Sequence, residues 1–130
     1  MSEENIKKLY DKAQKYLKTA NLLLEHEDFD SVISRTYYAM YYMVKSILLT
    51  KDIDTKTHRG LISAFGEHFV KTNIISKEMS KHLRNAFDKR LIGDYDFTES
   101  INKIEAEKFY NTGKKFINDI KEYLVKNNYL

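Results

Sequence analysis

The segment VISRTYYAMYYMVKSILL, residues 32–49, decides the fold of this chain. Drawn as an α-helix, it carries apolar side chains around most of its circumference, and a helix of that kind belongs in the centre of a protein. Asp28 and Asp30 come just before it and can cap its first turn. The sequence therefore predicts a central, deeply buried helix. Five residues interrupt its apolar surface: Ser34, Arg35, Thr36, Lys45 and Ser46.

Amphipathic helices are expected on both sides of this segment. Downstream, Thr57 and Ser76 can cap two shorter helices, the second of which should end in residues 93–96. Thr98 can then cap a last helix of about 30 residues, whose buried side includes Ile104. Upstream, residues 3–25 carry one apolar stripe at spacings of three and four: Ile6, Leu9, Ala13, Tyr16, Ala20 and Leu23.

The expected fold is all-α, an up-and-down antiparallel bundle of about five helices, three long and two shorter. We expect it to form one domain over residues 1–130. The composition agrees, because the chain has no proline and only four glycines, which leaves few points where a helix must break.

Composition also excludes several kinds of functional site. The chain has no cysteine, which excludes disulfides, thiolate metal sites and cysteine nucleophiles. It has no Glu-x-x-His or His-x-x-x-His pair and no glycine-rich loop before a helix, so we expect no metal and no cofactor. Because it also lacks a long apolar run and a secretory leader pattern, we expect a cytoplasmic protein without a membrane partner.

Basic residues concentrate in residues 71–90. The net charge of the whole chain is only +3, which does not by itself indicate nucleic-acid binding. Within the basic segment, Lys77, Lys81 and Arg84 recur at helical spacing and predict a cationic stripe that leads to Arg90. This stripe is either a solvated helix face or a surface that binds RNA. The cluster at residues 88–95 could bind phosphate.

Tyrosines gather on the central helix, where they cover more than one face. A buried hydroxyl without a partner costs about 1–3 kcal/mol, so some of these groups must reach polar partners or line a groove. The alternative is ordinary core packing. The four residues are Tyr37, Tyr38, Tyr41 and Tyr42.

Arg35 lies on the same helix, and its guanidinium needs an anionic partner. That partner is either Asp94 or Asp96, in an internal salt bridge, or a bound ligand. His58 follows Thr57 in the first turn of the next helix, where the helix dipole disfavours a protonated imidazole. Local capping is the simplest role for His58.

Three groups of residues carry a family resemblance: Ser34-Arg35-x-Tyr37-Tyr38-Ala39, Thr57-His58 and Arg90-x-x-x-Asp94-Tyr95. Together they resemble the HEPN (higher eukaryote and prokaryote nucleotide-binding) superfamily, in particular its small stand-alone bacterial and archaeal members. The likeness covers about residues 3–125. It implies a helical bundle that usually dimerises and is often encoded beside a minimal nucleotidyltransferase in toxin–antitoxin or defence modules.

Many members of that superfamily are metal-independent ribonucleases. Their hallmark is an arginine followed, after four to six residues, by a histidine, and the two act across the dimer interface on an RNA phosphate and its 2′-hydroxyl. This sequence has no such pair. One alignment puts Asp88 and Gly93 at the two positions, and another puts Arg90 and Tyr95 there. Tyrosine, with an unperturbed pKa near 10, is a poor general base at neutral pH.

Three hypotheses follow. In the first, the ribonuclease motif is degenerate and the protein binds a nucleotide, RNA or a nucleotidyltransferase through a groove near Arg35, Tyr38, Arg90, Asp94 and Tyr95. In the second, it is a metal-independent ribonuclease with a variant site, where Arg90 stabilises phosphate charge and Tyr95 or His58 supplies a proton. In the third, it is a structural adaptor that forms a homodimer through an exposed aromatic face. The missing histidine favours the first.

Overall fold

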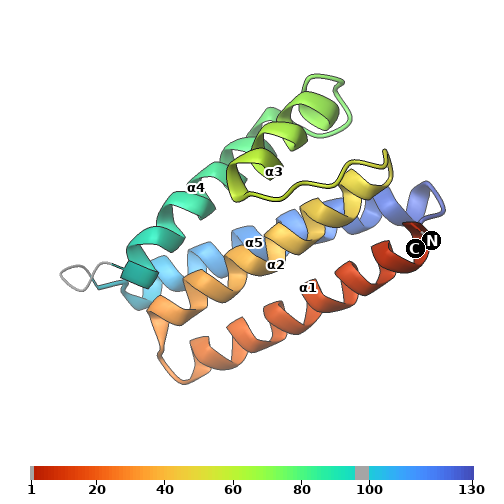
Figure 1. Ribbon diagram of the computed structural model, residues 1–130. Coiled ribbons are helices and arrows are strands. Elements are labelled where there is room, and N and C mark those ends of the chain that lie inside the picture. Colours follow the sequence, from red (N-terminus) through yellow and green to blue (C-terminus); the bar gives the residue numbers. More distant parts are fainter. Residues whose placement is uncertain (1, 96–99) are drawn as a thin grey trace.

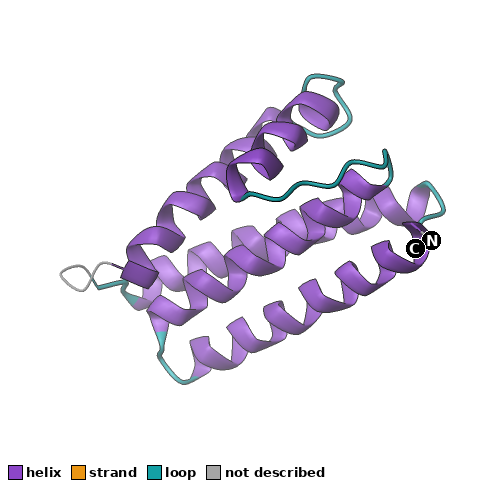
Figure 2. Cartoon of the chain, viewed as in Figure 1, coloured by secondary structure: helices purple, strands orange, loops and turns teal. Residues whose placement is uncertain are grey.

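The computed structural model describes residues 2–95 and 100–130, and this part of the chain is helical without strands (Figures 1 and 2). The predicted all-α bundle with three long helices is confirmed. None of the described helices is both long and apolar enough to cross a membrane. The elements are α1 (Ser2–Glu25), α2 (Phe29–Leu49), α3 (His58–Phe65), a π-helical turn η1 (Gly66–Val70), α4 (Lys77–Tyr95) and α5 (Lys103–Lys126).

The helix α2 is the central element, as its sequence predicts. It packs against α1, α4 and α5, which surround it (Figure 1). Eleven of its residues are buried, against six in α5, so α2 supplies more of the core than any neighbour. The largest fully buried side chains from the other helices include Phe65, Phe69 and Phe116, and the Phe65 ring packs against the other two.

A glycine sets how closely α5 approaches α2. A Cβ atom at Gly113 would collide with the methyl group of Thr36, so only a residue without a side chain fits this crossing. Thr36 is fully buried, and its hydroxyl has no hydrogen-bond partner among the described residues. The α2–α5 contact is therefore packed tightly and is almost entirely apolar.

Two of the predicted capping residues are confirmed. The Thr57 hydroxyl accepts a hydrogen bond from the Gly60 N–H at 2.9 Å, and the Ser76 hydroxyl accepts one from the Met79 N–H at 3.3 Å. Each side chain satisfies a backbone donor that the first turn of a helix would otherwise leave unpaired.

The predicted caps at Asp28 and Asp30 are wrong. Asp28 occupies the N-cap position of α2 without a side-chain capping bond, and Asp30 instead accepts a hydrogen bond from the Ile101 N–H at 3.2 Å. Asn102 caps α5 by accepting from the Glu105 N–H at 2.8 Å. Thr98, the predicted cap, lies outside the described residues.

Ile104 was expected on the buried side of α5, but its side chain is 77% exposed. The buried stripe passes through Ala106 instead. Residues two apart on a helix point about 200° away from each other, so one of these two must face solvent.

The helix α4 ends at Tyr95, within the predicted range of residues 93–96, but Gly93 and Asp94 belong to the helix and not to the loop expected there. Gly93 keeps a negative φ, so it does not end the helix. A Cβ atom at this position would lie 3.2 Å from the Asp30 carbonyl oxygen. The glycine therefore permits a close approach between the end of α4 and the start of α2.

The connection between α2 and α3 runs back beside α2 (Figure 1). As a result, His58 at the start of α3 lies against Tyr37 and Tyr41 in the middle of α2. The turn η1 then widens the helix, and the Lys71 N–H donates to the Gly66 carbonyl, five residues earlier. This arrangement places a titratable histidine beside the tyrosine cluster.

Candidate functional site

Three of the polar residues that the sequence singles out, Tyr38, Arg90 and Asp94, meet where α4 crosses α2. Arg90 is 8% exposed, and its Nη1 donates to the Tyr38 hydroxyl at 3.3 Å and to Asp94 Oδ2 at 3.4 Å. Its guanidinium also packs against the rings of Tyr37, Tyr38 and Phe87, at 5.4–5.6 Å from each centroid. The Nε atom has no hydrogen-bond partner among the described residues. Arg90 is thus a buried cation held by one carboxylate and three rings.

His58 faces this cation from α3. Burial lowers the pKa of His58, and the positive charges of Arg90 and then Lys45 lower it further. The ring lies 4.6 Å from the Tyr41 ring and 5.8 Å from Phe87, centroid to centroid. At neutral pH the imidazole is therefore uncharged.

The Tyr37 hydroxyl fixes which nitrogen of His58 carries the proton. The hydroxyl lies 2.7 Å from Nδ1, and burial raises the pKa of Tyr37 far above neutral, so the phenol keeps its proton. It has no other hydrogen-bond partner among the described residues. The hydroxyl therefore donates to Nδ1, and the neutral ring holds its own proton on Nε2.

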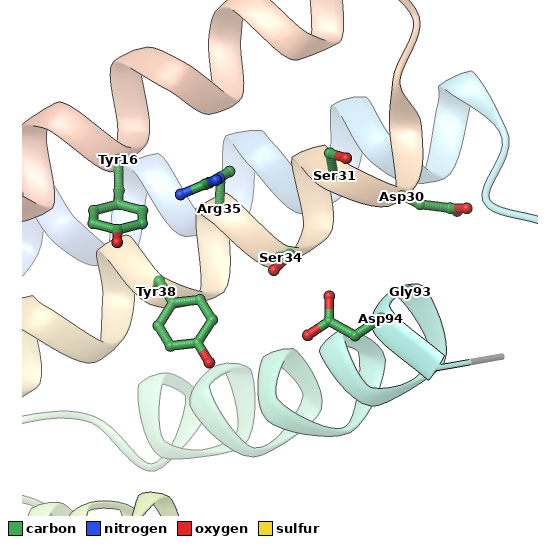
Figure 3. Close-up of a pocket in the computed structure, with 8 residues that line it drawn as sticks. All are labelled: Tyr16, Asp30, Ser31, Ser34, Arg35, Tyr38, Gly93 and Asp94. Atoms are coloured by element: carbon green, nitrogen blue, oxygen red, sulfur yellow. The ribbon is translucent and has the colours of Figure 1, made fainter.

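A pocket of about 300 Å³ opens beside this cluster, between α1, α2 and α4 (Figure 3). Arg35 is exposed at the pocket and forms no ion pair with any described residue; its guanidinium lies 5.3 Å from the centroid of the Tyr16 ring. The two carboxylates of the pocket are already occupied, Asp30 by the Ile101 N–H and Asp94 by Arg90. The lining residues are Tyr16, Asp30, Ser31, Ser34, Arg35, Tyr38, Gly93 and Asp94.

The predicted salt bridge between Arg35 and Asp94 is wrong. Because α4 remains helical through Tyr95, Asp94 lies one turn beyond Arg90 and pairs with it instead. Asp96, the other predicted partner, lies outside the described residues. Arg35 and Asp94 nevertheless line the same pocket, on opposite walls (Figure 3).

Tyr95 does not join the cluster. It is 74% exposed and makes no ring contact or side-chain hydrogen bond with a described residue. The predicted stripe does not extend to Arg90. Arg90 comes six positions after Arg84, so the two side chains lie on different faces of α4. Lys77, Lys81 and Arg84 line a separate hollow of about 440 Å³ beside Val70.

Several pocket residues carried no signal in the sequence. Tyr16 looked like one member of an apolar stripe, and Ser31 and Ser34 looked like ordinary helix residues. Only the crossing of three helices brings them together. The pairing of His58 with Tyr37 had a partial signal, because both belong to the motifs that resemble a known family. No three His, Asp or Glu side chains within residues 2–95 and 100–130 cluster in a way that could hold a metal ion.

Comparison with known proteins bears on the family and the fold. A family model described as "HEPN domain" matches residues 6–123. "Putative toxin MJ0142" of Methanocaldococcus jannaschii is 39% identical, over 98% of this chain and 87% of its own. A "UPF0332 protein" of Thermotoga maritima is 37% identical, over 85% of this chain and 89% of its own. The crystal structure of TT1696 from Thermus thermophilus shares the fold, with a TM-score of 0.76 at 12% identity over 90% of this chain and 96% of that one.

Proposed function

Because this chain belongs to the HEPN domain family, we propose that it is a nucleotide- or RNA-binding component of a toxin–antitoxin or defence-type module. A relative that carries a toxin name is similar over nearly the whole chain, which supports the assignment to such a module. In this proposal the phosphate of the ligand binds in the pocket between α1, α2 and α4. The ribonuclease motif of the family is degenerate.

The observation that carries the proposal is the free guanidinium of Arg35. A planar guanidinium can hold two phosphate oxygens at once, which makes arginine well suited to this ligand. Ser31 and Ser34 add hydroxyl donors on the same wall of the pocket (Figure 3). Asp94 is paired with Arg90, and Asp30 accepts only a backbone N–H, so Arg35 is the cation of this pocket that has no ion pair with a described residue.

A binding experiment with matched variants tests this proposal. We expect Arg35→Ala to weaken binding of a fluorescent nucleotide and of a labelled RNA by roughly 10- to 100-fold, the equivalent of one charged hydrogen-bonded contact. Arg35→Lys should recover part of the loss. The control Lys114→Ala removes the same charge from an exposed position of α5 and should change affinity by less than about twofold. Equal losses in the two alanine variants, or no binding by the wild type, would contradict the proposal.

The second candidate function is a metal-independent ribonuclease that uses Arg90 and His58. The observation in its favour is that the two side chains lie close enough for the charge of Arg90 to depress the pKa of His58. Two features oppose it. Arg90 is already committed to Tyr38 and Asp94, and the Nδ1 of His58 already accepts the Tyr37 proton, so the neutral ring offers a donor where a general base is needed.

A cleavage assay separates the two candidates. Mixed single-stranded and transfer RNAs are incubated with the wild type and with His58→Gln, without added metal, and the products are resolved on a gel. We expect no new product from either protein. Cleavage that disappears in His58→Gln would make the protein an enzyme and overturn the non-catalytic proposal. Arg90→Ala is a poor first variant because Arg90 is buried.

A homodimer and a minimal nucleotidyltransferase partner are further parts of the proposal. Both are implied by membership of the family. Light scattering across a wide concentration range tests the first, and co-purification with a co-expressed nucleotidyltransferase tests the second. If the protein stays monomeric at every concentration, the structural-adaptor hypothesis is also excluded.

A further inference from the structure

A second cationic surface lies at the start of α4, apart from the pocket between α1, α2 and α4. It is a hollow of about 440 Å³, and Val70, the half-buried last residue of η1, forms part of its apolar lining. We call it the α4–η1 hollow. Along α4, nine positions separate Arg84 in this hollow from Gly93 in the pocket, which is about 14 Å of helix. The hollow is therefore a separate site.

Three cations line the α4–η1 hollow. Lys77, Lys81 and Arg84 follow one another at intervals of four and three residues, so they lie along one face of α4 over about 10 Å. All three are exposed, and none forms an ion pair with a described residue. The first turn of α4 adds the positive end of the helix dipole. The hollow therefore concentrates positive charge that the described part of the chain does not pair.

Glu78 also lines this hollow, but its carboxylate interacts with other groups. Its Oε1 lies 3.7 Å from Nε2 of His82, and Glu78 lines a further hollow on the α5 side together with His82 and Lys115. Asp119 raises the pKa of Lys115, and the charge of Glu78 raises it further. The negative charge of Glu78 thus acts toward α5 and leaves the three cations without an acidic partner.

A buried hydroxyl lies among the cations. Ser80 is 6% exposed, lines the hollow, and shares its helix face with Lys77 and Arg84, three and four positions away. Its hydroxyl forms no hydrogen bond with a residue that the structure describes. Because buried polar groups are normally hydrogen-bonded, this hydroxyl is available to an acceptor from outside the chain.

We propose that the α4–η1 hollow binds an acidic segment of a partner protein, whose carboxylates contact Lys77, Lys81, Arg84 and the Ser80 hydroxyl. An apolar side chain of the same segment covers Val70. Complementary charge of this kind speeds the encounter of two proteins and fixes their register. The inference goes beyond the proposed function, because it concerns a surface that the phosphate pocket does not use.

The extent of the stripe favours a short acidic segment over a nucleic acid. Asp88 follows Arg84 by four residues, so an exposed carboxylate continues the same face of α4. A phosphate backbone that ran on along the helix would meet this negative charge. A short peptide needs only the groups that line the hollow.

The test measures binding of a labelled ten-residue peptide in which glutamates flank one central leucine. A peptide with glutamines in place of the glutamates should bind at least tenfold more weakly, since it lacks the charged contacts. Unlabelled citrate should displace the acidic peptide only at concentrations at least tenfold higher than the unlabelled peptide requires. Displacement by citrate at equal concentration would make the ligand a small polycarboxylate and overturn the protein partner.

Variants locate the binding surface. Lys81→Glu should weaken peptide binding about tenfold, whereas Lys18→Glu, the same change at an exposed position of α1, should change it by less than about twofold. Ser80→Ala should weaken it about fivefold, which a stripe of surface cations alone would not produce. Equal losses in the two glutamate variants, or no loss in Ser80→Ala, would overturn the inference. Each variant is checked for native helical content.

A labelled ten-nucleotide RNA separates this surface from the phosphate pocket. Arg35→Ala should weaken binding of the RNA and leave binding of the peptide within about twofold, and Lys81→Glu should do the reverse. If Lys81→Glu weakens RNA binding as much as peptide binding, the hollow is a nucleic-acid surface and the inference fails. If the RNA does not bind but the peptide does, the proposed function fails and the docking surface stands.

Discussion

The contact of α2 with α5 is apolar, whereas its contact with α4 is polar and charged. Against α5, α2 presents Thr36 and Met40 to a glycine, and the helices touch almost without polar groups. Against α4, it presents Tyr37 and Tyr38 to a buried arginine and to the histidine at the start of α3. The first contact gains stability from burial alone, whereas the second must satisfy a cation that folding has removed from water.

The difference separates a contact that stability explains from one that stability alone does not explain. Apolar packing of similar volume would be at least as stable as a buried ion pair. The α2–α4 crossing nevertheless keeps Arg90, Asp94 and His58, and it lies beside the pocket. Local stability does not explain this choice of residues, and the proposed binding site for a charged ligand would.

The largest expected effect concerns the α2–α5 contact. Gly113→Ala should lower the free energy of unfolding by about 2 kcal/mol, because the new methyl group overlaps that of Thr36 and forces the helices apart. Urea denaturation measures the change.

Two further variants make this prediction specific. Gly66→Ala, where a Cβ atom would meet nothing within 4 Å, should instead stabilise the protein by up to about 1 kcal/mol. Thr36→Ser deletes the opposing methyl group and should restore much of the loss when combined with Gly113→Ala. No recovery in the double variant would mean that the crossing is not limited by this contact.

A smaller effect is expected at the α2–α4 contact. Asp94→Asn removes the negative charge that faces Arg90 while keeping the shape of the side chain, and it should cost about 1 kcal/mol. The pair is 3.4 Å long and Asp94 is partly exposed, which keeps the cost below that of a fully buried pair. The control Asp88→Asn, at an exposed position earlier in α4 and in no ion pair with a described residue, should stay within about 0.5 kcal/mol of the wild type. Equal costs would show that Asp94 does not hold Arg90.

The smallest effect is a dependence of stability on pH. The pKa of His58 is lowered in the folded protein, so as the pH falls through about 6.5 the unfolded chain takes up a proton before the folded one does. The free energy of unfolding should therefore fall between pH 7 and pH 5, by at most about 1.4 kcal/mol per pH unit for this one proton.

Substitution at His58 isolates this contribution. His58→Gln keeps an acceptor for the Tyr37 hydroxyl and cannot become charged, so the decline in stability should be shallower than in the wild type. His26→Gln, which changes an exposed histidine in the turn after α1, is the matched control. A slope that changes by the same amount in both variants would contradict the assignment to His58.

The helices could be predicted because each depends on residues that are near neighbours in sequence. The apolar circumference of residues 32–49 and the stripe at residues 3–25 were enough to predict the first two long helices. Thr57 and Ser76 capped the helices that follow them, as expected. These features need only the period of the α-helix and the chemistry of its first turn.

The site could be predicted only in part, because its contacts join residues far apart in sequence. Arg90 and Tyr38 are 52 residues apart, and His58 and Tyr37 are 21 apart. The segment that begins at Gly93 predicts a loop because glycine is common just after helix ends, but the missing Cβ atom of Gly93 instead permits the approach to the Asp30 carbonyl. That one error separated Asp94 from Arg90 and assigned it to Arg35.

The π-helical turn η1 has a consequence for the length of the chain. A single-turn π-helix is an α-helix that has accommodated one extra residue. The hydrogen bond from Lys71 N–H to the Gly66 carbonyl reaches back five residues in place of four. Deleting the exposed Glu67 would leave Phe69 three residues after Phe65 in place of four, and both spacings keep the two rings on one side of a helix. This segment is therefore one where relatives can differ by a single residue while the tyrosine cluster and the arginine beside it stay in place.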